Sequence, residues 1–380
     1  MPYAFTLDDV AFLASPAGRD ALGSVTPTGD PLRDATAARA SVGDRAAAVL
    51  ETVLLRDRAA GRVPAGWLLT ADAAAQATAR PVAEHRAARL AGRDVHDVTC
   101  SVGAELAALR TSAARVVGSD LDPVRLAMAR HNVPDVALVR ADALAPVTRA
   151  AVVVADPARR TAAGRRVWRP GSFTPPLDEL VDAVGGRDLV VSSAPGLDFS
   201  LVPWAGEVEL VSLDGRVREA ALWSAGLART RRRATVLSSA GPAWEVTDTG
   251  DDTCDVRAAG EWIVDPDGAV VRAGLVRQWG ARHGLGRLDA HLAYLTGDAP
   301  PPGVRAFRVL EEGRYSERAL RQVLHRRGVG RVEILVRGLD VDPALLRPRL
   351  RLRGPEEATV VLARLDTGPR AYVCTSGVSE

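Results

Sequence analysis

The chain has 380 residues, of which 47% are apolar and 25% charged, so a largely disordered polypeptide is excluded. At roughly 100–200 residues per domain, this length indicates two or three domains. No apolar run approaches the about 18 residues of a spanning helix, and the first ten residues lack a secretory leader pattern. The 3 cysteines are far apart, and the 6 histidines show no ligand spacing. We therefore expect a cytoplasmic protein without a disulfide framework, a membrane anchor or a bound metal.

The basic residues are unevenly distributed. All 49 are Arg, and residues 305–353 contain 13 of them against 6 acidic residues, whereas the whole chain has a net charge of only +2. Such clustering is typical of a nucleic-acid-binding module attached to a less basic domain. The alternative is an ordinary solvated surface in a chain that uses Arg at every basic position.

The first 82 residues favour helices. Residues 35–60 are rich in Ala and carry apolar residues at helical spacing, which predicts one amphipathic helix that ends at Gly61. Thr70 is placed to cap a second helix, and Pro81 suits the first turn of a third.

Short apolar runs then alternate with helix-compatible stretches. The runs cover residues 94–100, 114–120, 136–142, 150–156 and 187–193. This alternation predicts strand–helix–strand units and a parallel sheet. Residues 208–224 differ, because two alternating runs flank Asp214-Gly215, the pattern of a β-hairpin.

The C-terminal part predicts mixed secondary structure. A strand–helix–strand piece with its helix near 271–283 comes after a polar stretch. The last module then predicts a helix over 316–328 and strands over 331–338, 347–354 and 358–365. In the middle strand, Arg alternates with Leu, which would place the arginines on one face, where they could follow a phosphate backbone. These arginines are Arg347, Arg349, Arg351 and Arg353.

Polar residues follow three successive predicted strands. The first strand ends at Cys100, and Ser101-Val102-Gly103 turns into a helix, where glycine would let the backbone approach a ligand. Asp120 ends the second strand and could accept hydrogen bonds from ribose hydroxyls. Asp142 follows the third and is placed either to bind an exocyclic amine or to cap its loop. Asp122-Pro123 is better interpreted as a helix cap.

A fourth carboxylate points to the acceptor. Asp156-Pro157 follows a run of four apolar residues, so Asp156 is expected at the carboxyl edge of the sheet, where it could orient or deprotonate an amine or hydroxyl. Arg159 and Arg160 come next and could hold a phosphate, although a solvated turn is the alternative.

The order Gly103, Asp120, Asp142 and Asp156-Pro157, followed by a hairpin, resembles class I S-adenosylmethionine-dependent methyltransferases. More narrowly, the segments QATARPVAEHRAARL, ARHN, DPARR and RVEILVRGLDVDPALLRPRLRLRG are similar to bacterial methyltransferases with a C-terminal THUMP-like domain. The stretch from the helix before the first predicted strand to the loop after the second also resembles the trimethylguanosine synthases, which methylate guanine N2 in RNA. The resemblance implies a Rossmann-like α/β sheet with N-terminal helices and a C-terminal α+β module. The domains implied are 1–82, helical; 83–240, methyltransferase; 241–304, ferredoxin-like; and 305–380, THUMP-like.

The same resemblance implies the site. S-adenosylmethionine would be bound by Cys100, Ser101, Gly103, Asp120, Leu121, Asp142 and Asp156, with Asp156, Pro157 and Arg159 catalytic. The clustering of the arginines themselves, and not the resemblance, predicts that structured RNA, either rRNA or tRNA, is bound by Arg347, Arg349, Arg351, Arg353, Arg231 and Arg232. The loop has one glycine where relatives have two or three, and Ala158-Arg159 replaces a proline and a stacking aromatic, for which Trp168 is a candidate substitute. The alternatives are a non-catalytic RNA-binding protein, or a methyltransferase for a protein or small molecule.

Overall fold

The computed structural model describes residues 3–158 and 169–375. The chain forms two compact units, one made of Met1–Val208 with Glu219–Arg229 and the other of Glu209–Arg218 with Thr230–Glu380. In the described ranges, every helix is too short or too polar to cross a lipid bilayer.

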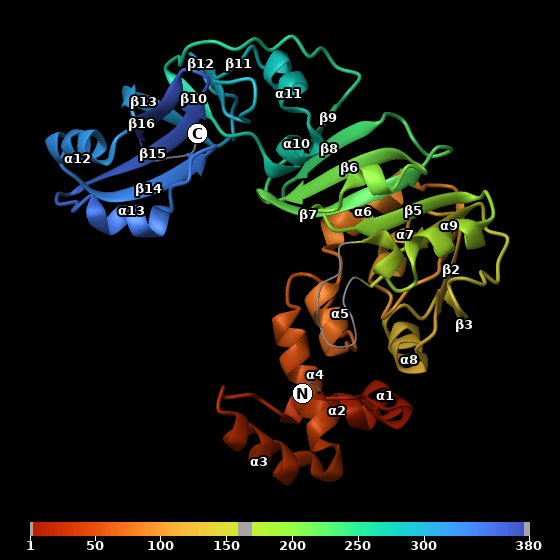
Figure 1. Cartoon of the computed structure of the whole chain (residues 1–380). Helices are drawn as coiled ribbons and strands as arrows, with labels where there is room; N and C mark the ends of the chain where they lie inside the picture. The colour runs from red at the N-terminus through yellow and green to blue at the C-terminus, as the bar shows by residue number, and fades with distance from the viewer. Residues whose placement is uncertain (1–2, 159–168, 376–380) are drawn as a thin grey trace. The chain divides into compact units, whose positions relative to one another are not determined.

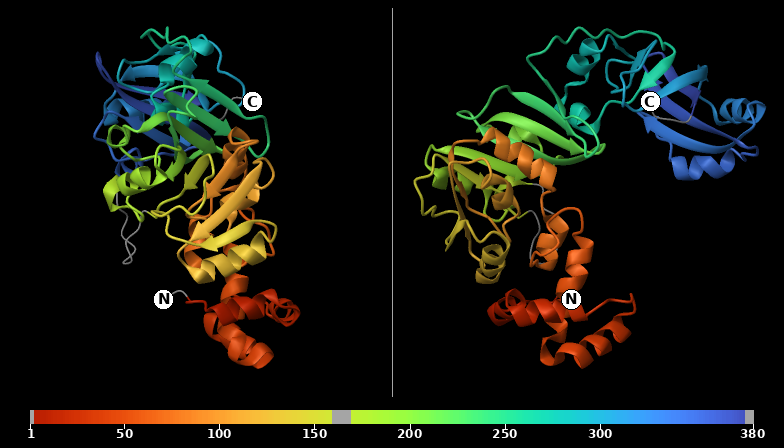
Figure 2. Two further views of the ribbon diagram at one scale, coloured as in Figure 1. Left: turned by 90° about the vertical axis from the view of Figure 1, so that its right-hand side faces the viewer. Right: turned by 180° about the vertical axis from the view of Figure 1, so that it is seen from behind.

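The first unit begins with a helical bundle, drawn in red and orange in Figures 1 and 2. Its helices are α1 (Leu7–Ala14), α2 (Pro16–Ser24), α3 (Pro31–Val42) and α4 (Ala46–Arg58). The single helix expected over 35–60 is wrong, because Gly43 has φ +60° and a 3₁₀ turn (Gly43–Arg45) separates α3 from α4. Glycine adopts this conformation without a Cβ penalty, so the chain changes direction there.

The next two helices agree with the prediction. Thr70 caps α5 (Ala71–Gln76), and Pro81 lies in the first turn of α6 (Arg80–Arg89). One apolar core joins the N-terminal bundle to two later helices of the same unit. In this core, buried side chains of α1 and α4 pack with those of α7 (Ala104–Leu109) and α8 (Pro123–Asn132).

A parallel sheet confirms the strand–helix alternation. Its strands are β1 (Asp94–Asp97), β2 (Arg115–Asp120), β3 (Ala137–Arg140), β4 (Val152–Ala155) and β5 (Asp188–Ser193). All neighbouring pairs in the order β3-β2-β1-β4-β5 are parallel. A 3₁₀ turn (Pro170–Ser172) and α9 (Leu177–Val184) precede β5, and a second turn (Phe199–Leu201) comes after it.

The expected hairpin extends this sheet. β6 (Ala205–Leu213) and β7 (Arg216–Ser224) are joined by Asp214 and Gly215, which both have positive φ as a two-residue hairpin turn requires. β7 pairs antiparallel with β5, and the full sheet order is β3-β2-β1-β4-β5-β7-β6-β8-β9. β8 covers Arg232–Leu237 and β9 covers Trp244–Thr247.

The second sheet has seven strands in the order β11-β12-β10-β13-β16-β15-β14. Its first part contains β10 (Trp262–Val264), β11 (Gly286–Arg287) and β12 (Leu295–Gly297). Two short helices, α10 (Gly268–Ala273) and α11 (Val276–Arg282), replace the single helix expected near 271–283, because Gly274 at φ +76° ends the first. The ferredoxin-like character and the domain boundaries stay predictions.

The C-terminal module contains β13 (Ala306–Arg314), α12 (Glu317–Arg326), β14 (Val329–Arg337), α13 (Pro343–Arg349), β15 (Glu356–Leu365) and β16 (Gly368–Thr375). The expected helix and two of the expected strands, β14 and β15, are present, whereas β13 and β16 were not predicted. The strand over 347–354 is wrong. Of the residues in that range, 347–349 belong to α13, and 350–354 form no strand.

Local sequence explains this helix. The Asp342 side chain accepts a hydrogen bond from the Ala344 N–H, and Pro343 lies in the first turn, which together favour a helix start. Leu346 and Leu350 are buried four residues apart, so helical spacing serves the core better than alternation does. Arg347, Arg349, Arg351 and Arg353 therefore do not share one strand face.

Candidate functional site

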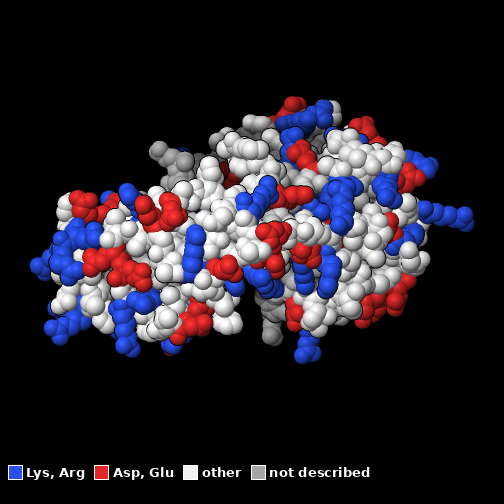
Figure 3. Space-filling view, turned by 90° about the horizontal axis from the view of Figure 1, so that it is seen from above, with Lys and Arg blue, Asp and Glu red and all other residues white. Residues whose placement is uncertain are grey.

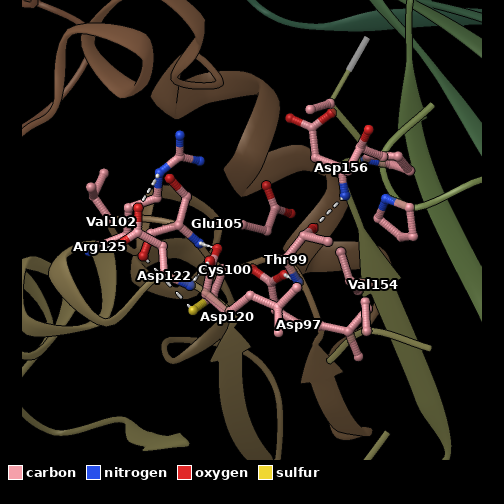
Figure 4. A pocket seen from close by; sticks show the side chains of 18 of the residues that line it. Asp97, Thr99, Cys100, Val102, Glu105, Asp120, Asp122, Arg125, Val154 and Asp156 are labelled. Carbon is pink, nitrogen blue, oxygen red and sulfur yellow. Dashed lines mark hydrogen bonds and ion pairs between the residues drawn. The ribbon is translucent and has the colours of Figure 1, made fainter. Parts of the chain in front are cut away.

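A pocket of the first unit lies at the carboxyl ends of β1, β2 and β4 and has a volume of about 770 Å³ (Figure 4). Ligands of open α/β sheets bind at this edge. Six of the seven residues predicted to bind a cofactor line it, namely Cys100, Ser101, Asp120, Leu121, Asp142 and Asp156. The α5 helix and the segment after it contribute Asp72, Gln76 and Thr78 to another wall.

Gly103 is not among the residues that line the pocket, and its expected role in letting the backbone approach a ligand stays a prediction. It has φ +94°, and a Cβ placed there would lie 2.9 Å from the Val133 side chain. Glycine is therefore required by the turn and by packing against α8. The wall is formed instead by Ser101, which has φ +48°, a conformation that costs energy in a residue other than glycine.

Asp120 connects the end of β2 to this loop. Its Oδ2 accepts a hydrogen bond from the Ser101 N–H at 3.0 Å, and its Oδ1 accepts one from the Asp122 N–H at 2.9 Å. A carboxylate oxygen can accept more than one hydrogen bond, so these contacts leave acceptor capacity toward the pocket. Leu121 comes next, with its side chain exposed at the pocket wall.

Two further aspartates accept hydrogen bonds from backbone N–H groups. Asp122 accepts hydrogen bonds from the Val124 and Arg125 N–H groups, which confirms it as the cap of α8. Asp142 is exposed and accepts a hydrogen bond from the Leu144 N–H at 2.9 Å. The loop-capping alternative for Asp142 is thus present, and its side chain also lines the pocket.

Asp156 and Pro157 lie at the pocket edge after β4. The Thr99 hydroxyl accepts a hydrogen bond from the Asp156 N–H at 2.7 Å, which links the acceptor edge to the β1 loop. Ala158 exchanges two backbone hydrogen bonds with Thr174, so Thr174 and Pro175 line the pocket beside Pro157. Arg159, Arg160 and Trp168 lie outside the described residues.

The sequence reasoning missed Asp97, which is only 2% exposed at the end of β1 and lines the pocket. Its Oδ1 accepts a hydrogen bond from the Thr99 N–H at 3.1 Å, and no cationic side chain among the described residues pairs with it. Burial raises the pKa of this carboxyl well above its usual range, and repulsion by Glu105, Asp120 and Asp156 raises it further. An aspartate three residues before Cys100 was the available signal.

A buried ion cluster was also missed. Arg86 of α6 is 3% exposed, and its guanidinium pairs with Glu105 of α7 and Glu219 of β7. Burial alone would lower the pKa of Arg86, but the two carboxylates raise it above its usual value. These residues come from three distant segments of the chain, so the sequence pattern did not indicate the cluster. The available signal was the segment QATARPVAEHRAARL, which contains Arg86.

The cysteine at the site is unsuited to nucleophilic chemistry. Cys100 is buried, and burial together with the nearby carboxylates Asp97 and Asp120 raises the pKa of its thiol far above the usual value. Because the thiolate is the reactive form, Cys100 serves as an apolar wall.

The predicted arginines fall into different surroundings. Arg347, Arg349, Arg351 and Arg353 are all exposed, and Arg349 lies 3.8 Å from Glu317. Arg231 is exposed and Arg232 is half-buried, and the backbone N–H groups of both donate to the Asp248 carboxylate. The neighbouring Arg233 is buried and pairs with Glu245, so it does not belong to an accessible basic surface.

A parallel sheet with carboxylates after successive strands, grouped in one pocket, defines an enzyme fold that binds a nucleotide-like cofactor. Comparisons with known proteins specify the class. Two proteins from Mycobacterium tuberculosis strains CDC 1551 and H37Rv, both described as uncharacterized S-adenosylmethionine-dependent methyltransferases, are each 55% identical over 357 residues. The match covers 88% of this chain and 99% of each relative. The chain belongs to this family of S-adenosylmethionine-dependent methyltransferases.

The remaining comparisons agree with this class. A THUMP domain-like family matches residues 304–376, and a domain family of unknown function matches residues 6–59. A crystal structure of a proposed methyltransferase from Porphyromonas gingivalis shares the fold, with a TM-score of 0.73 and 17% identity over 97% of this chain and 96% of that one. The predicted fold class, enzyme class and methyl donor are confirmed.

The pocket is chemically suited to this donor. S-adenosylmethionine carries positive charge on its sulfonium and ammonium groups, and the pocket contains a buried carboxyl, Asp97, that lacks a cationic partner among the described residues. Asp120 offers acceptors at the position that binds ribose hydroxyls in nucleotide folds.

Proposed function

We propose that the protein methylates structured RNA, either rRNA or tRNA, at an amine of a base, in the cytoplasm. The observation that supports the RNA substrate is a group of four arginines on one side of the C-terminal module, three of them exposed and one half-buried, for which no acidic partner occurs among the described residues. The observation that supports an amine acceptor is Asp156 at the open edge of the donor pocket.

In this proposal the donor residues have separate tasks. Asp97 binds the ammonium group of the methionine part, Asp120 accepts from the ribose hydroxyls, and Asp142 lies toward the adenine amine, with Leu121 against the ring. Ser101 and Cys100 form the wall between them. S-adenosylmethionine, when bound, supplies a methyl group that its sulfonium charge already activates, so the protein contributes mainly proximity and alignment.

The acceptor residues act at the other end. Asp156 would accept a hydrogen bond from the acceptor amine and favour loss of its proton as the new N–C bond forms. Pro157, Pro175 and Pro176 line this part of the pocket. Their apolar rings offer a surface against which a base can pack in place of the stacking aromatic of related enzymes.

The total charge of the C-terminal module does not by itself make a basic surface. On the face that Figure 3 presents, acidic side chains lie interspersed among the arginines. Several arginines of the module pair with acids, including Arg326 and Arg327 with Glu311 and Arg331 with Glu357. Such pairs leave little charge for a phosphate backbone, so the arginines without partners matter most.

These arginines gather where α12 meets α13. Glu317 lies beside Arg349, and the His325 ring nitrogen Nε2 lies 3.0 Å from the Arg351 carbonyl, so both ends of α12 border α13 and its tail. Arg321 lies four residues from each, on the same face of α12. No acidic partner of Arg321, Arg347, Arg351 or Arg353 occurs among the described residues. We call these four residues the α12–α13 arginines.

The test is methyl transfer to RNA. The purified enzyme, with S-adenosylmethionine labelled in its methyl group, is incubated with total RNA from a strain lacking the gene and from the parent strain. We expect label in the RNA of the deletion strain and little in the parental RNA, which already carries the modification. Nucleoside analysis then identifies the atom. Label in protein or in small molecules, with none in RNA, would contradict the proposal.

A further inference from the structure

The ion cluster beneath the donor pocket contains more carboxyl groups than cations. Arg86 Nη1 lies 2.8 Å from Glu105 Oε2, and Arg86 Nη2 contacts Glu219 Oε1, while the Ser192 hydroxyl donates to the other Glu219 oxygen from β5. Glu105 Oε1 has no hydrogen-bond partner among the described residues, and Glu105 Oε2 meets only the Arg86 guanidinium. Arg86 is thus shared between two carboxylates and neutralises only one charge.

Asp97 adds a third carboxyl to this region. It is almost fully buried, and the nearby charge of Glu105 raises its pKa. Asp156, at the pocket edge, raises the pKa of both Asp97 and Glu105. Figure 4 shows the three side chains. Unbalanced buried charge of one sign is costly unless an opposite charge binds nearby. The arrangement therefore favours a cation in the pocket, beyond the single ammonium group that Asp97 can bind.

The donor and the product of methyl transfer differ in this respect. S-adenosylmethionine has a positively charged sulfonium, whereas S-adenosylhomocysteine has a neutral thioether in the same place and keeps the ammonium group. A carboxylate close to the sulfur would stabilise bound S-adenosylmethionine and leave bound S-adenosylhomocysteine nearly unaffected. It need not be hydrogen-bonded to the ligand, since a Coulomb interaction needs no direct contact.

We propose that Glu105, held in place by Arg86, is a charge-selecting residue that makes the enzyme bind its cationic donor more tightly than its neutral product. This inference rests on the donor site proposed above. Glu105 is suited to the role because its oxygens are shielded from water, which keeps its field strong, while its side chain lines the pocket. Selection of this kind speeds the exchange of product for new donor.

The selection depends on pH. Burial raises the pKa of Glu105 to about 7, Arg86 opposes the shift, and Glu219 and Asp156 add to it. The groups that act on Glu105 are Arg86 from α6, Asp97 from β1, Asp156 after β4 and Glu219 from β7. Since only the ionised form attracts a sulfonium, the preference for donor over product rises as pH increases through neutrality.

The experiment measures binding of three ligands to the full-length enzyme by calorimetry. They are S-adenosylmethionine, S-adenosylhomocysteine and sinefungin, which carries an ammonium group near the position of the sulfonium. In Glu105→Gln we expect affinity for the two cationic ligands to fall about threefold to thirtyfold relative to the product. The matched control is Glu84→Gln, which removes an exposed carboxylate from α6 that pairs with Arg80 outside the pocket.

The outcomes separate the possibilities. Equal losses for all three ligands, or no change in their ratio, would show that Glu105 is structural and overturn the inference. Absence of donor binding in the wild-type enzyme would refute the donor site itself. If Glu105→Gln does not fold, the wild-type pH series decides, because a donor-to-product affinity ratio that stays constant between pH 6 and 8 contradicts the role of Glu105. A pH dependence that persists in a folded Glu105→Gln would assign it to another group and equally overturn the inference.

Discussion

The Asp120 carboxylate accepts a hydrogen bond from the backbone N–H of Ser101 at 3.0 Å, so the end of β2 fixes the loop after β1. Replacing Asp120 with Ala removes this support together with the ribose acceptor. We expect donor affinity to fall about tenfold to a hundredfold, since one to two hydrogen bonds to a charged group are lost. Calorimetric titration measures it. Asp135→Ala, which removes an exposed partner of Arg110, should retain the affinity of the parent enzyme.

Ser101 holds a conformation that favours glycine. Its φ of +48° predicts that Ser101→Gly is tolerated, with a change in the free energy of unfolding within about 1 kcal/mol, because relief of the left-handed conformation offsets the entropy cost of glycine. Ser101→Val should lose more than about 1 kcal/mol, since a β-branched residue is poorly accommodated there. Thermal unfolding of both variants checks this, and equal melting temperatures for the two would refute it.

The buried Asp97 predicts a conflict between stability and binding. Because folding raises the pKa of this carboxyl, the folded state holds its proton more readily than the unfolded state does. The free energy of unfolding therefore decreases as pH rises above about 4, the pKa of the carboxyl in the unfolded chain. Asp97→Asn mimics the neutral form. We expect the ligand-free variant to melt several degrees higher than the parent at pH 8, yet to bind S-adenosylmethionine at least about tenfold more weakly. A variant that is both less stable and unimpaired in binding would contradict this assignment.

His96 predicts acid sensitivity of the first unit. The ring is fully buried in β1, with Nε2 2.9 Å from the Ser119 hydroxyl and Nδ1 3.0 Å from that of Thr148. Burial, with a contribution from Arg187, lowers the pKa of His96 to about 4. The unfolded state therefore binds the proton more readily, and stability falls as pH decreases from about 6.5 to 4.

This one histidine should account for about 3 kcal/mol of the loss. Denaturant unfolding at a series of pH values measures it, and His96→Gln provides the comparison because it does not titrate. An identical pH dependence in the variant and the parent would rule out this contribution.

The α12–α13 arginines predict the salt dependence of RNA binding. In Arg321→Gln/Arg351→Gln we expect weaker RNA binding and a salt slope smaller by about 1.4 to 1.8, since each of the two phosphate contacts contributes roughly 0.7 to 0.9. The matched control is Arg326→Gln/Arg327→Gln, which removes the same charge from arginines that already pair with Glu311. Electrophoretic shift assays at two salt concentrations compare them. Equal effects of the two double variants would indicate that only net charge matters.

The sequence predicts the sheet well because local patterns determine it. Apolar runs locate β1 to β5, and Asp214-Gly215 locates the hairpin. Prediction failed where a local pattern competed with a stronger one. The alternation of Arg and Leu suggested a strand, but the Asp342-Pro343 cap and the spacing of the buried leucines favour α13.

The site was predictable only in part. Asp120, Asp142 and Asp156 lie at or just after the ends of strands, so their position at the sheet edge comes from chain order alone. The cluster of Arg86, Glu105 and Glu219 depends on how α6, α7 and β7 pack, and no periodicity in one segment encodes that. The role of Asp97 depends on its burial, which the four-residue β1 does not reveal from its sequence.

The core shared by the N-terminal bundle and α8 has a consequence for engineering. Asn132 in α8 bonds to both backbone groups of Leu68 and to the Val102 carbonyl of the pocket loop, so it connects the entry segment to the donor wall. A shortened enzyme that starts at residue 83 would strip the apolar covering from α8 and leave Asn132 with only one of these partners. The N-terminal helices are thus part of the core of the methyltransferase domain, and an enzyme truncated at residue 83 should aggregate rather than fold into a smaller active enzyme.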